Sequence, residues 1–173
     1  ISFEKQQKKW DYYLHIAIAP TKMNDRFEWF LEKATEIGID EITPIICDNS
    51  ERKILKMERM KKVLVSAMKQ SLKFELPKLN EPVKFSEIIQ LNSANIKLIA
   101  HCEDPDKKNT IKNLVKPNKN ILILIGPEGD FSTKEIGTAL HHQFIPLSLG
   151  ASRLRTETAG IVACSSISVI NEK

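Results

Sequence analysis

Cysteine is scarce in this sequence, and long apolar runs are missing from it. Of 173 residues only 3 are cysteines, and they form no C-x-x-C pair, so neither a disulfide framework nor a zinc site is indicated. We interpret Cys47, Cys102 and Cys164 as small core residues of a reduced, cytoplasmic protein. No bound metal is expected.

Several sequence signals that would assign a function are also absent. The longest apolar run, at residues 121–125, is far shorter than the roughly 20 residues that a membrane-spanning helix needs. The N-terminal segment is polar and rich in lysine, unlike a secretory signal peptide. The G-x-G-x-x-G and G-x-x-x-x-G-K-[ST] fingerprints do not occur. We therefore expect no membrane partner, and neither a dinucleotide-binding nor a P-loop protein.

The charge balance is mildly basic. Lys and Arg number 26 against 22 Asp and Glu, which gives a net charge of +4. Such a balance is compatible with a nucleic-acid partner but does not require one. Many of the basic residues fall in the helical stretch at 52–73, where a solvated helix face explains them equally well.

The spacing of apolar residues predicts alternating strands and helices. Strands are expected at residues 12–19, 41–47, 96–101, 120–126 and 144–149. Helices are expected from Asn24 to Ile37, at 59–73 and 110–115, from Ser132 onward, and at 156–170. Pro44 indicates that its strand lies near a sheet edge. The alternation favours an α/β domain with a mainly parallel sheet flanked by helices.

Three loops follow predicted strands, and ligands of open parallel sheets bind at such carboxyl ends. One begins at His101. The next, Gly-Pro-Glu-Gly-Asp at 126–130, has two glycines that let a ligand approach the backbone, and Ser132 to Glu135 fits a helix capping box. A plain strand-to-helix turn remains an alternative. The loop at 150–158 contains Arg153 and Arg155. These arginines suit an anion bound at the N-terminus of a helix that Thr156 caps. Alternatively, they are simple surface arginines.

Together the loops resemble the motifs of one family, the RsmE-type 16S ribosomal RNA (uracil-N3)-methyltransferases of the SPOUT superfamily. Residues 124–132 with Glu135 are similar to its G-P-E-G-G-x-S/T-x-x-E motif, and residues 149–159 to its L-G-x-x-x-L-R-x-E-T-A motif. Residues 32–39 resemble Q-K-A-T-E-L-G-V, and residues 70–73 with Pro77 resemble E-Q-S-x-R. The resemblance runs from Tyr12 to Ile170 in the family's order.

Two positions depart from the family pattern, and one domain is unaccounted for. Asp130 stands where the motif has its second glycine, and it adds a negative charge. Lys73 stands where the family has an arginine, so the positive charge is kept but the planar, forked guanidinium group is lost. The family begins with a small PUA-like β-barrel. We expect residues 1–11 to be a remnant of, or linker from, such a domain, and residues 12–173 to form the SPOUT methyltransferase domain.

The resemblance implies a C-terminal trefoil knot, a homodimer and S-adenosylmethionine as the cofactor. It also implies that backbone and side chains of the three loops hold that cofactor. The implied cofactor-binding residues are His101, Glu103, Ile125, Gly126, Pro127, Glu128, Gly129, Leu147, Leu149, Gly150, Leu154 and Thr156.

The implied reaction is methylation of N3 of a uridine in 16S ribosomal RNA. Because N3 is a poor nucleophile until it loses its proton, a base or an anion-stabilising group is needed. Arg155 is the expected stabiliser of the uracil anion, and Glu128 and Glu157 are candidate bases or orienting groups. Glu157 could equally be structural, paired with an arginine. A ribose 2′-O-methyltransferase of the same superfamily and a non-catalytic RNA-binding module remain alternatives.

Overall fold

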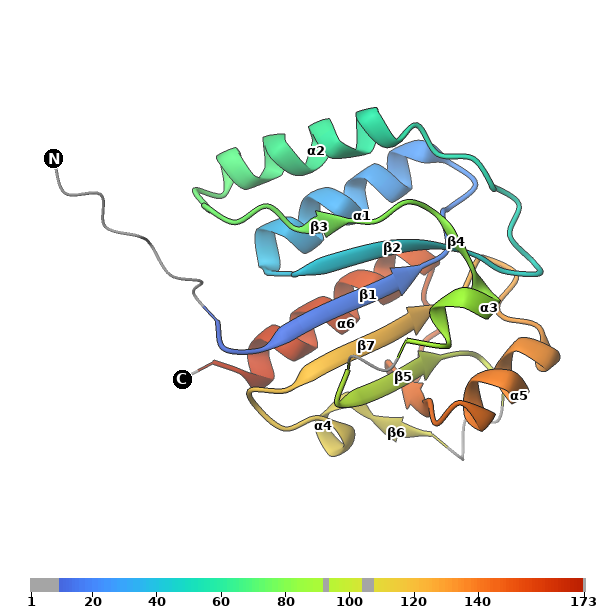
Figure 1. Ribbon diagram of the computed structural model, residues 1–173. Helices are drawn as coiled ribbons and strands as arrows, with labels where there is room; N and C mark the ends of the chain where they lie inside the picture. The colour runs from blue at the N-terminus through green and yellow to red at the C-terminus, as the bar shows by residue number, and fades with distance from the viewer. Residues whose placement is uncertain (1–9, 92–93, 104–107, 173) are drawn as a thin grey trace, which may run out of the picture.

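The computed structural model describes residues 10–91, 94–103 and 108–172. Its centre is a single eight-stranded sheet in which every described strand pair is parallel. The strand order is β3-β2-β1-β7-β5-β8-β6, with β4 also paired to β2 (Figure 1). The strands are β1 (Tyr13–Ile18), β2 (Glu41–Ile46), β3 (Lys78–Leu79), β4 (Val83–Lys84), β5 (Ile96–Ala100), β6 (Asn109–Thr110), β7 (Asn120–Ile125) and β8 (Ile145–Ser148).

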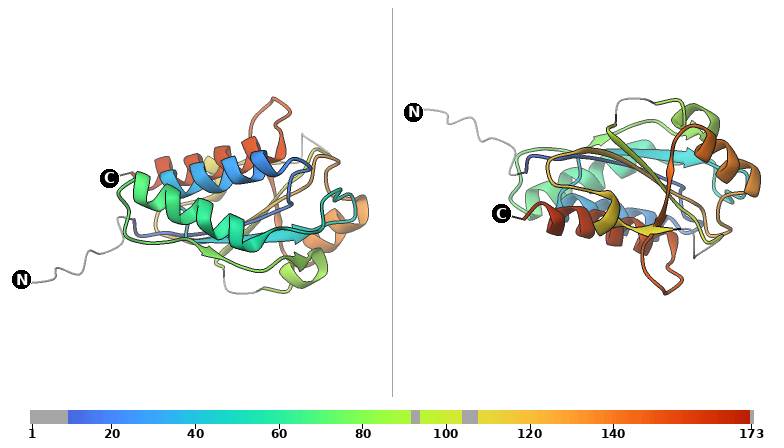
Figure 2. Two further views of the ribbon diagram at one scale, coloured as in Figure 1. Left: turned by 90° about the horizontal axis from the view of Figure 1, so that it is seen from above. Right: turned by 90° about the horizontal axis from the view of Figure 1, so that it is seen from below.

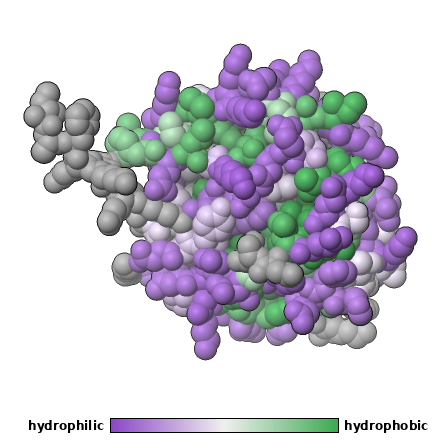
Figure 3. Space-filling view, in the orientation of Figure 1, coloured by the Kyte–Doolittle hydropathy of each residue, from purple (hydrophilic) through white to green (hydrophobic). Residues whose placement is uncertain are grey.

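Helices cover the sheet on both faces, as Figure 2 shows. On one face lie α1 (Asn24–Ile37), α2 (Met57–Gln70), α4 (Ile111–Leu114) and α6 (Thr156–Ile170). On the other lie α3 (Phe85–Ile88) and α5 (Thr133–His141). The mainly parallel α/β sheet flanked by helices that the sequence predicts is therefore confirmed. Polar side chains cover most of the surface in the view of Figure 3.

The central strand β7 explains why the sequence is nearly all apolar there. Ile121, Ile123 and Ile125 pack with the α1 and α6 side of the core, while Leu122 and Leu124 pack with the α5 side. All five are at most 2% exposed. A strand between two helical layers needs apolar side chains on both faces, so its period-two alternation of polarity is lost.

The position of Pro44 agrees with the expectation that its strand lies near a sheet edge. Strand β2 is second from the edge, between β1 and the short strands β3 and β4. The backbone N–H groups of Lys78 and Asn80 bond to the carbonyls of Asp40 and Ile42, so this side of β2 faces β3. Because the backbone groups of successive strand residues point to alternate sides, the nitrogen of Pro44, two residues after Ile42, points to the same side as the Ile42 carbonyl. There β3 has ended and β4 has not begun, so no ladder bond is lost.

Other expectations on the sequence are refined by the structure. Helix α1 begins at Asn24 as expected, and the residue at its N-terminal cap position is Met23. Cys47 and Cys164 are buried, but Cys102 is exposed, so it is not the core residue expected. The segment 78–95, which has linker-like composition, contains β3, β4 and α3. Of the expected domain remnant at residues 1–11, all but the last two residues lie outside the described part of the chain.

Candidate functional site

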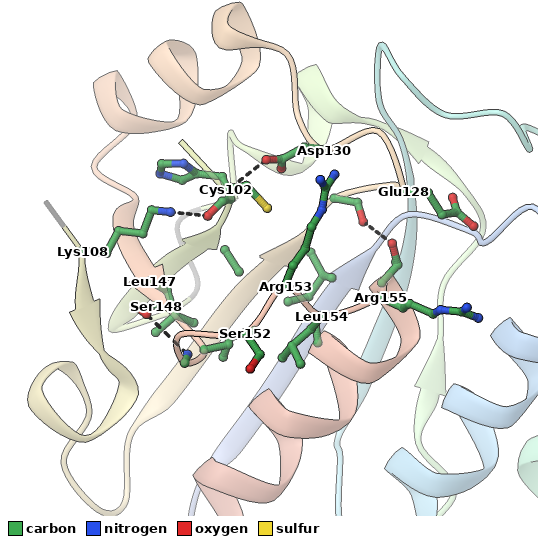
Figure 4. A pocket seen from close by; sticks show the side chains of 18 of the residues that line it. Cys102, Lys108, Glu128, Asp130, Leu147, Ser148, Ser152, Arg153, Leu154 and Arg155 are labelled. Carbon is green, nitrogen blue, oxygen red and sulfur yellow. Dashed lines mark hydrogen bonds between the residues drawn. The ribbon is translucent and has the colours of Figure 1, made fainter. Parts of the chain in front are cut away.

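A cavity of about 550 Å³ opens at the carboxyl edge of the sheet. The loops after β5, β7 and β8 and the first turn of α6 form its walls (Figure 4). Parallel strands bring these three chain segments to one edge. The lining residues are Ala100, His101, Cys102, Lys108, Ile125, Gly126, Pro127, Glu128, Asp130, Leu147, Ser148, Leu149, Gly150, Ala151, Ser152, Arg153, Leu154, Arg155, Thr156 and Ala159.

Gly126 lies where β7 meets the cavity, and close packing explains the missing side chain. A Cβ atom there would come within 3.0 Å of Cδ2 and 3.2 Å of the backbone nitrogen of Phe131. Phe131 is buried and packs against Phe85, with ring centroids 5.5 Å apart, so it has little room to move. Only glycine therefore fits between this loop and Phe131.

The first turn of α6 is attached to the same loop. Thr156 is the first helical residue, and its hydroxyl donates to the carbonyl oxygen of Gly126 at 3.0 Å. The expectation that Thr156 caps the helix is wrong: the cap position belongs to Arg155, and no side chain bonds there. The threonine hydroxyl instead joins two walls of the cavity.

The arginines of the loop after β8 differ in direction. In Figure 4 the Arg153 side chain extends across the cavity mouth toward Asp130, whereas Arg155 points away from Leu154 and out of the cavity. Both are exposed. Glu128, also exposed, accepts a hydrogen bond at 2.9 Å from the backbone N–H of Lys22. The rim of the cavity thus carries two guanidinium groups and a carboxylate.

The structure brings most of the sequence-predicted site residues to this cavity. Those that line it are His101, Ile125, Gly126, Pro127, Glu128, Leu147, Leu149, Gly150, Leu154, Arg155 and Thr156. Three predicted residues are not among the lining residues. Gly129 packs against Asn49, and Glu103 accepts a hydrogen bond from Thr133 at 2.9 Å. Glu157 is 7% exposed, and its Oε1 lies 3.5 Å from Nη1 of Arg26.

Several lining residues are outside the predicted set. Asp130 and Arg153 lie inside the recognised motifs, and their charge is the signal that could have singled them out. Lys108 donates to the carbonyl oxygen of His101, a contact that no local sequence pattern indicates. Cys102 lines the cavity as well. Its partial burial and the neighbouring Asp130 carboxylate raise the pKa of its thiol.

Among the described residues there is no group of three or more His, Cys, Asp or Glu side chains that could hold a metal ion. The same part of the chain contains no helix long and apolar enough to cross a membrane. The cavity combines apolar lining residues such as Ile125, Leu147 and Leu154 with charged residues at its rim.

Comparison with known proteins gives a consistent result. The family model described as RNA methyltransferase domain matches residues 8–168. The ribosomal RNA small subunit methyltransferase E of Buchnera aphidicola (subsp. Acyrthosiphon pisum, strain APS) is 32% identical over 96% of this chain and 68% of its own length. Its counterpart in Mesomycoplasma hyopneumoniae is 34% identical, over 86% of this chain and 65% of that protein. The chain thus spans about two thirds of these relatives.

A solved structure from Porphyromonas gingivalis, of a probable rRNA-methyltransferase, superposes with a TM-score of 0.91 at 44% identity. The alignment covers 97% of this chain and 71% of that one.

Proposed function

Because the chain belongs to the RNA methyltransferase domain family, of the RsmE type, we propose that it transfers a methyl group from S-adenosylmethionine to N3 of a uridine in 16S ribosomal RNA. The observation that carries the proposal is that the two motifs at residues 124–132 and 149–159 line one cavity. The buried bond from Thr156 to Gly126 ties those motifs together.

The cavity suits S-adenosylmethionine. Its volume of about 550 Å³ is in the range of small-molecule sites. Ile125, Leu147 and Leu154 supply apolar walls for a purine. The charged side chains of the lining, such as Arg153, suit the polar amino-acid end of the cofactor. When bound, the cofactor supplies an electrophilic methyl group on a sulfonium.

The protein's part in the reaction is to orient the uridine and to stabilise the anion formed when N3 loses its proton. We assign the latter role to Arg155, which stands on the cavity rim at the positive end of α6. Its exposure leaves it accessible to a large RNA substrate. Glu128, on the same rim, is the proposed base or orienting group. Glu157 acts through Arg26, away from the lining.

We also propose the trefoil knot. In its favour, β8 is inserted between β5 and β6, and the helices before and after it, α5 and α6, lie on opposite faces of the sheet. Such a knot is rare and is a mark of specific folds.

A homodimer is proposed as well. Trp29 on α1 and Val169 on the neighbouring α6 are 42% and 59% exposed and offer apolar surface for a partner subunit. A ribosomal RNA substrate implies a cytoplasmic location.

Calorimetric titration with S-adenosylmethionine tests the proposal first. We expect saturable binding by the wild-type chain and loss of binding in Gly126→Val, because the new side chain would meet Phe131. Gly137→Ala is the control, since nothing lies within 4 Å of a Cβ there. Mass spectrometry of 16S RNA treated with the protein and S-adenosylmethionine then locates the methyl group. A 2′-O-methyl product would contradict the N3 assignment, and a folded wild type that binds no cofactor would leave a non-catalytic RNA-binding module.

A further inference from the structure

Asp130 is a junction between three loops at the cavity. Its Oδ2 accepts a hydrogen bond at 2.7 Å from the backbone N–H of Cys102, in the loop after β5 (Figure 4). Its Oδ1 accepts one at 2.8 Å from the N–H of Phe131. Its carbonyl oxygen accepts a third, at 3.1 Å, from the side-chain amide of Asn49 in the loop after β2. A single residue thus connects the ends of β2, β5 and β7.

The backbone of Asp130 is held in a conformation that glycine adopts more easily. Its φ angle is 63°, in the left-handed region, and its N–H bonds to the carbonyl oxygen of Pro127 at 2.9 Å. Aspartate tolerates this region better than most residues but is still strained there. The motif that this loop resembles has glycine at the corresponding place. Backbone strain kept at a cavity wall, where glycine would remove it, points to a use for the side chain.

What the carboxylate adds is a tether on the loop after β5. Glycine at 130 would keep the turn and the contact with Asn49, which involve backbone atoms, but would leave the Cys102 N–H without its acceptor. Charge-assisted bonds of this length are stronger than neutral ones. The tethered loop carries His101 and Cys102, which both line the cavity.

We propose that Asp130 is a positioning residue that fixes residues 101–103 as one wall of the cofactor cavity and so determines cofactor affinity. This inference rests on the proposed function. Without the tether, the loop would have to be ordered when the cofactor binds, and that cost would weaken binding. Because Asp130 acts on a wall of the cavity and not on the rim that meets RNA, its loss should raise the KM for cofactor and leave the KM for RNA unchanged.

Two substitutions at this position and one matched control test the inference. Asp130→Gly removes the tether and the strain together, and Asp130→Asn keeps one acceptor oxygen. Gln143→Gly is the control, because Gln143 has a φ of 65° and lies outside the cavity lining. Each variant is measured for the Kd of S-adenosylmethionine by calorimetry and for the hydrogen-exchange rate of the Cys102 amide. Thermal unfolding verifies that each is folded.

We expect Asp130→Gly to raise the Kd about tenfold or more, as for a lost hydrogen bond to a charged group, and to accelerate exchange at Cys102. Asp130→Asn should fall between it and the wild type, and Gln143→Gly should match the wild type. A Kd for Asp130→Gly within twofold of the wild type, or unaltered exchange at Cys102, overturns the inference alone. A wild-type chain that binds no cofactor overturns the proposed function and this inference with it.

Discussion

The hydroxyl of Thr156 donates a hydrogen bond to the carbonyl oxygen of Gly126 over 3.0 Å, in a buried position. The two residues are 30 positions apart, one at the start of the last helix and the other at the end of the central strand. The bond satisfies a carbonyl group that has left the sheet ladder, and it fixes the distance between two walls of the cavity. We therefore expect fold stability and cofactor binding to be coupled at this point.

Replacing Thr156 by Val should destabilise the fold by about 1–3 kcal/mol, since the shape is retained while the Gly126 carbonyl loses its donor in a buried place. Urea denaturation measures the change, and titration with S-adenosylmethionine should show weaker binding. Thr156→Ser is the matched control because it retains the hydroxyl. Equal stability of the Val variant and the wild type would show that the bond contributes nothing.

Gly160 should not tolerate even a methyl group. A Cβ there would lie 2.6 Å from Cε2 of Phe30, a fully buried ring, and 3.1 Å from Cδ1 of Ile18. We expect Gly160→Ala to cost about 1–3 kcal/mol through overpacking between α6 and α1. Gly137→Ala, in the exposed middle of α5, should instead stabilise by roughly 0.5–1 kcal/mol through helix propensity. Urea midpoints that shift in the same direction for both variants would contradict the packing argument.

Arg26 and Glu157 should be energetically coupled. The carboxylate of Glu157 is buried, its Oε1 is 3.5 Å from Arg26, and its Oε2 has no hydrogen-bond partner among the described residues. Arg26→Met should therefore destabilise by about 1–3 kcal/mol, because a buried charge loses its counterion. Glu157→Gln in the same chain should recover part of that loss, as a double-mutant cycle in urea would show.

The Glu157→Gln variant also distinguishes the two roles considered for Glu157, which are a structural partner of an arginine and a base in the reaction. Since the residue is not among those lining the cavity, we expect Glu157→Gln to keep turnover within about tenfold of the wild type. A loss of more than about 100-fold in kcat with unchanged stability would assign Glu157 to proton removal instead.

Acid stability should depend on Glu41. Burial acts to raise the pKa of its carboxyl, but hydrogen bonds from Lys78 and Asn80 prevail and lower it from 4.5 to about 2. A carboxyl whose pKa is depressed in the folded state stabilises the fold above pH 4.5, and this contribution is lost as the pH falls toward 2. Glu41→Gln should thus lower stability at pH 7 and flatten its decline between these values. Urea midpoints across this range test it, with Glu58→Gln, an exposed residue of α2, as the control.

Local patterns in the sequence were sufficient for the longer elements and for two walls of the site, but not for β3, β4 and α3. The apolar run of β7 and the helical spacing of Phe27, Phe30 and Leu31 in α1 predicted a buried strand and an amphipathic helix, because burial on the two faces of a strand and on one face of a helix imposes those periods. The capping box at Ser132 is present, with Ser132 accepting from the N–H of Glu135 at 3.2 Å. The motif loops around Gly126 and Arg155 do meet in one cavity.

The sequence by itself determined the α/β class, the order of the longer elements and the family, since these follow from local periodicity and from motifs within short segments. Contacts between distant segments were decided only by the tertiary structure. Thr156 bonds across to Gly126 instead of capping its helix, Pro44 falls at the gap between two neighbouring strands, and Asp130 tethers the loop of Cys102. Each depends on which strands become neighbours in the sheet, and no local spacing encodes that choice.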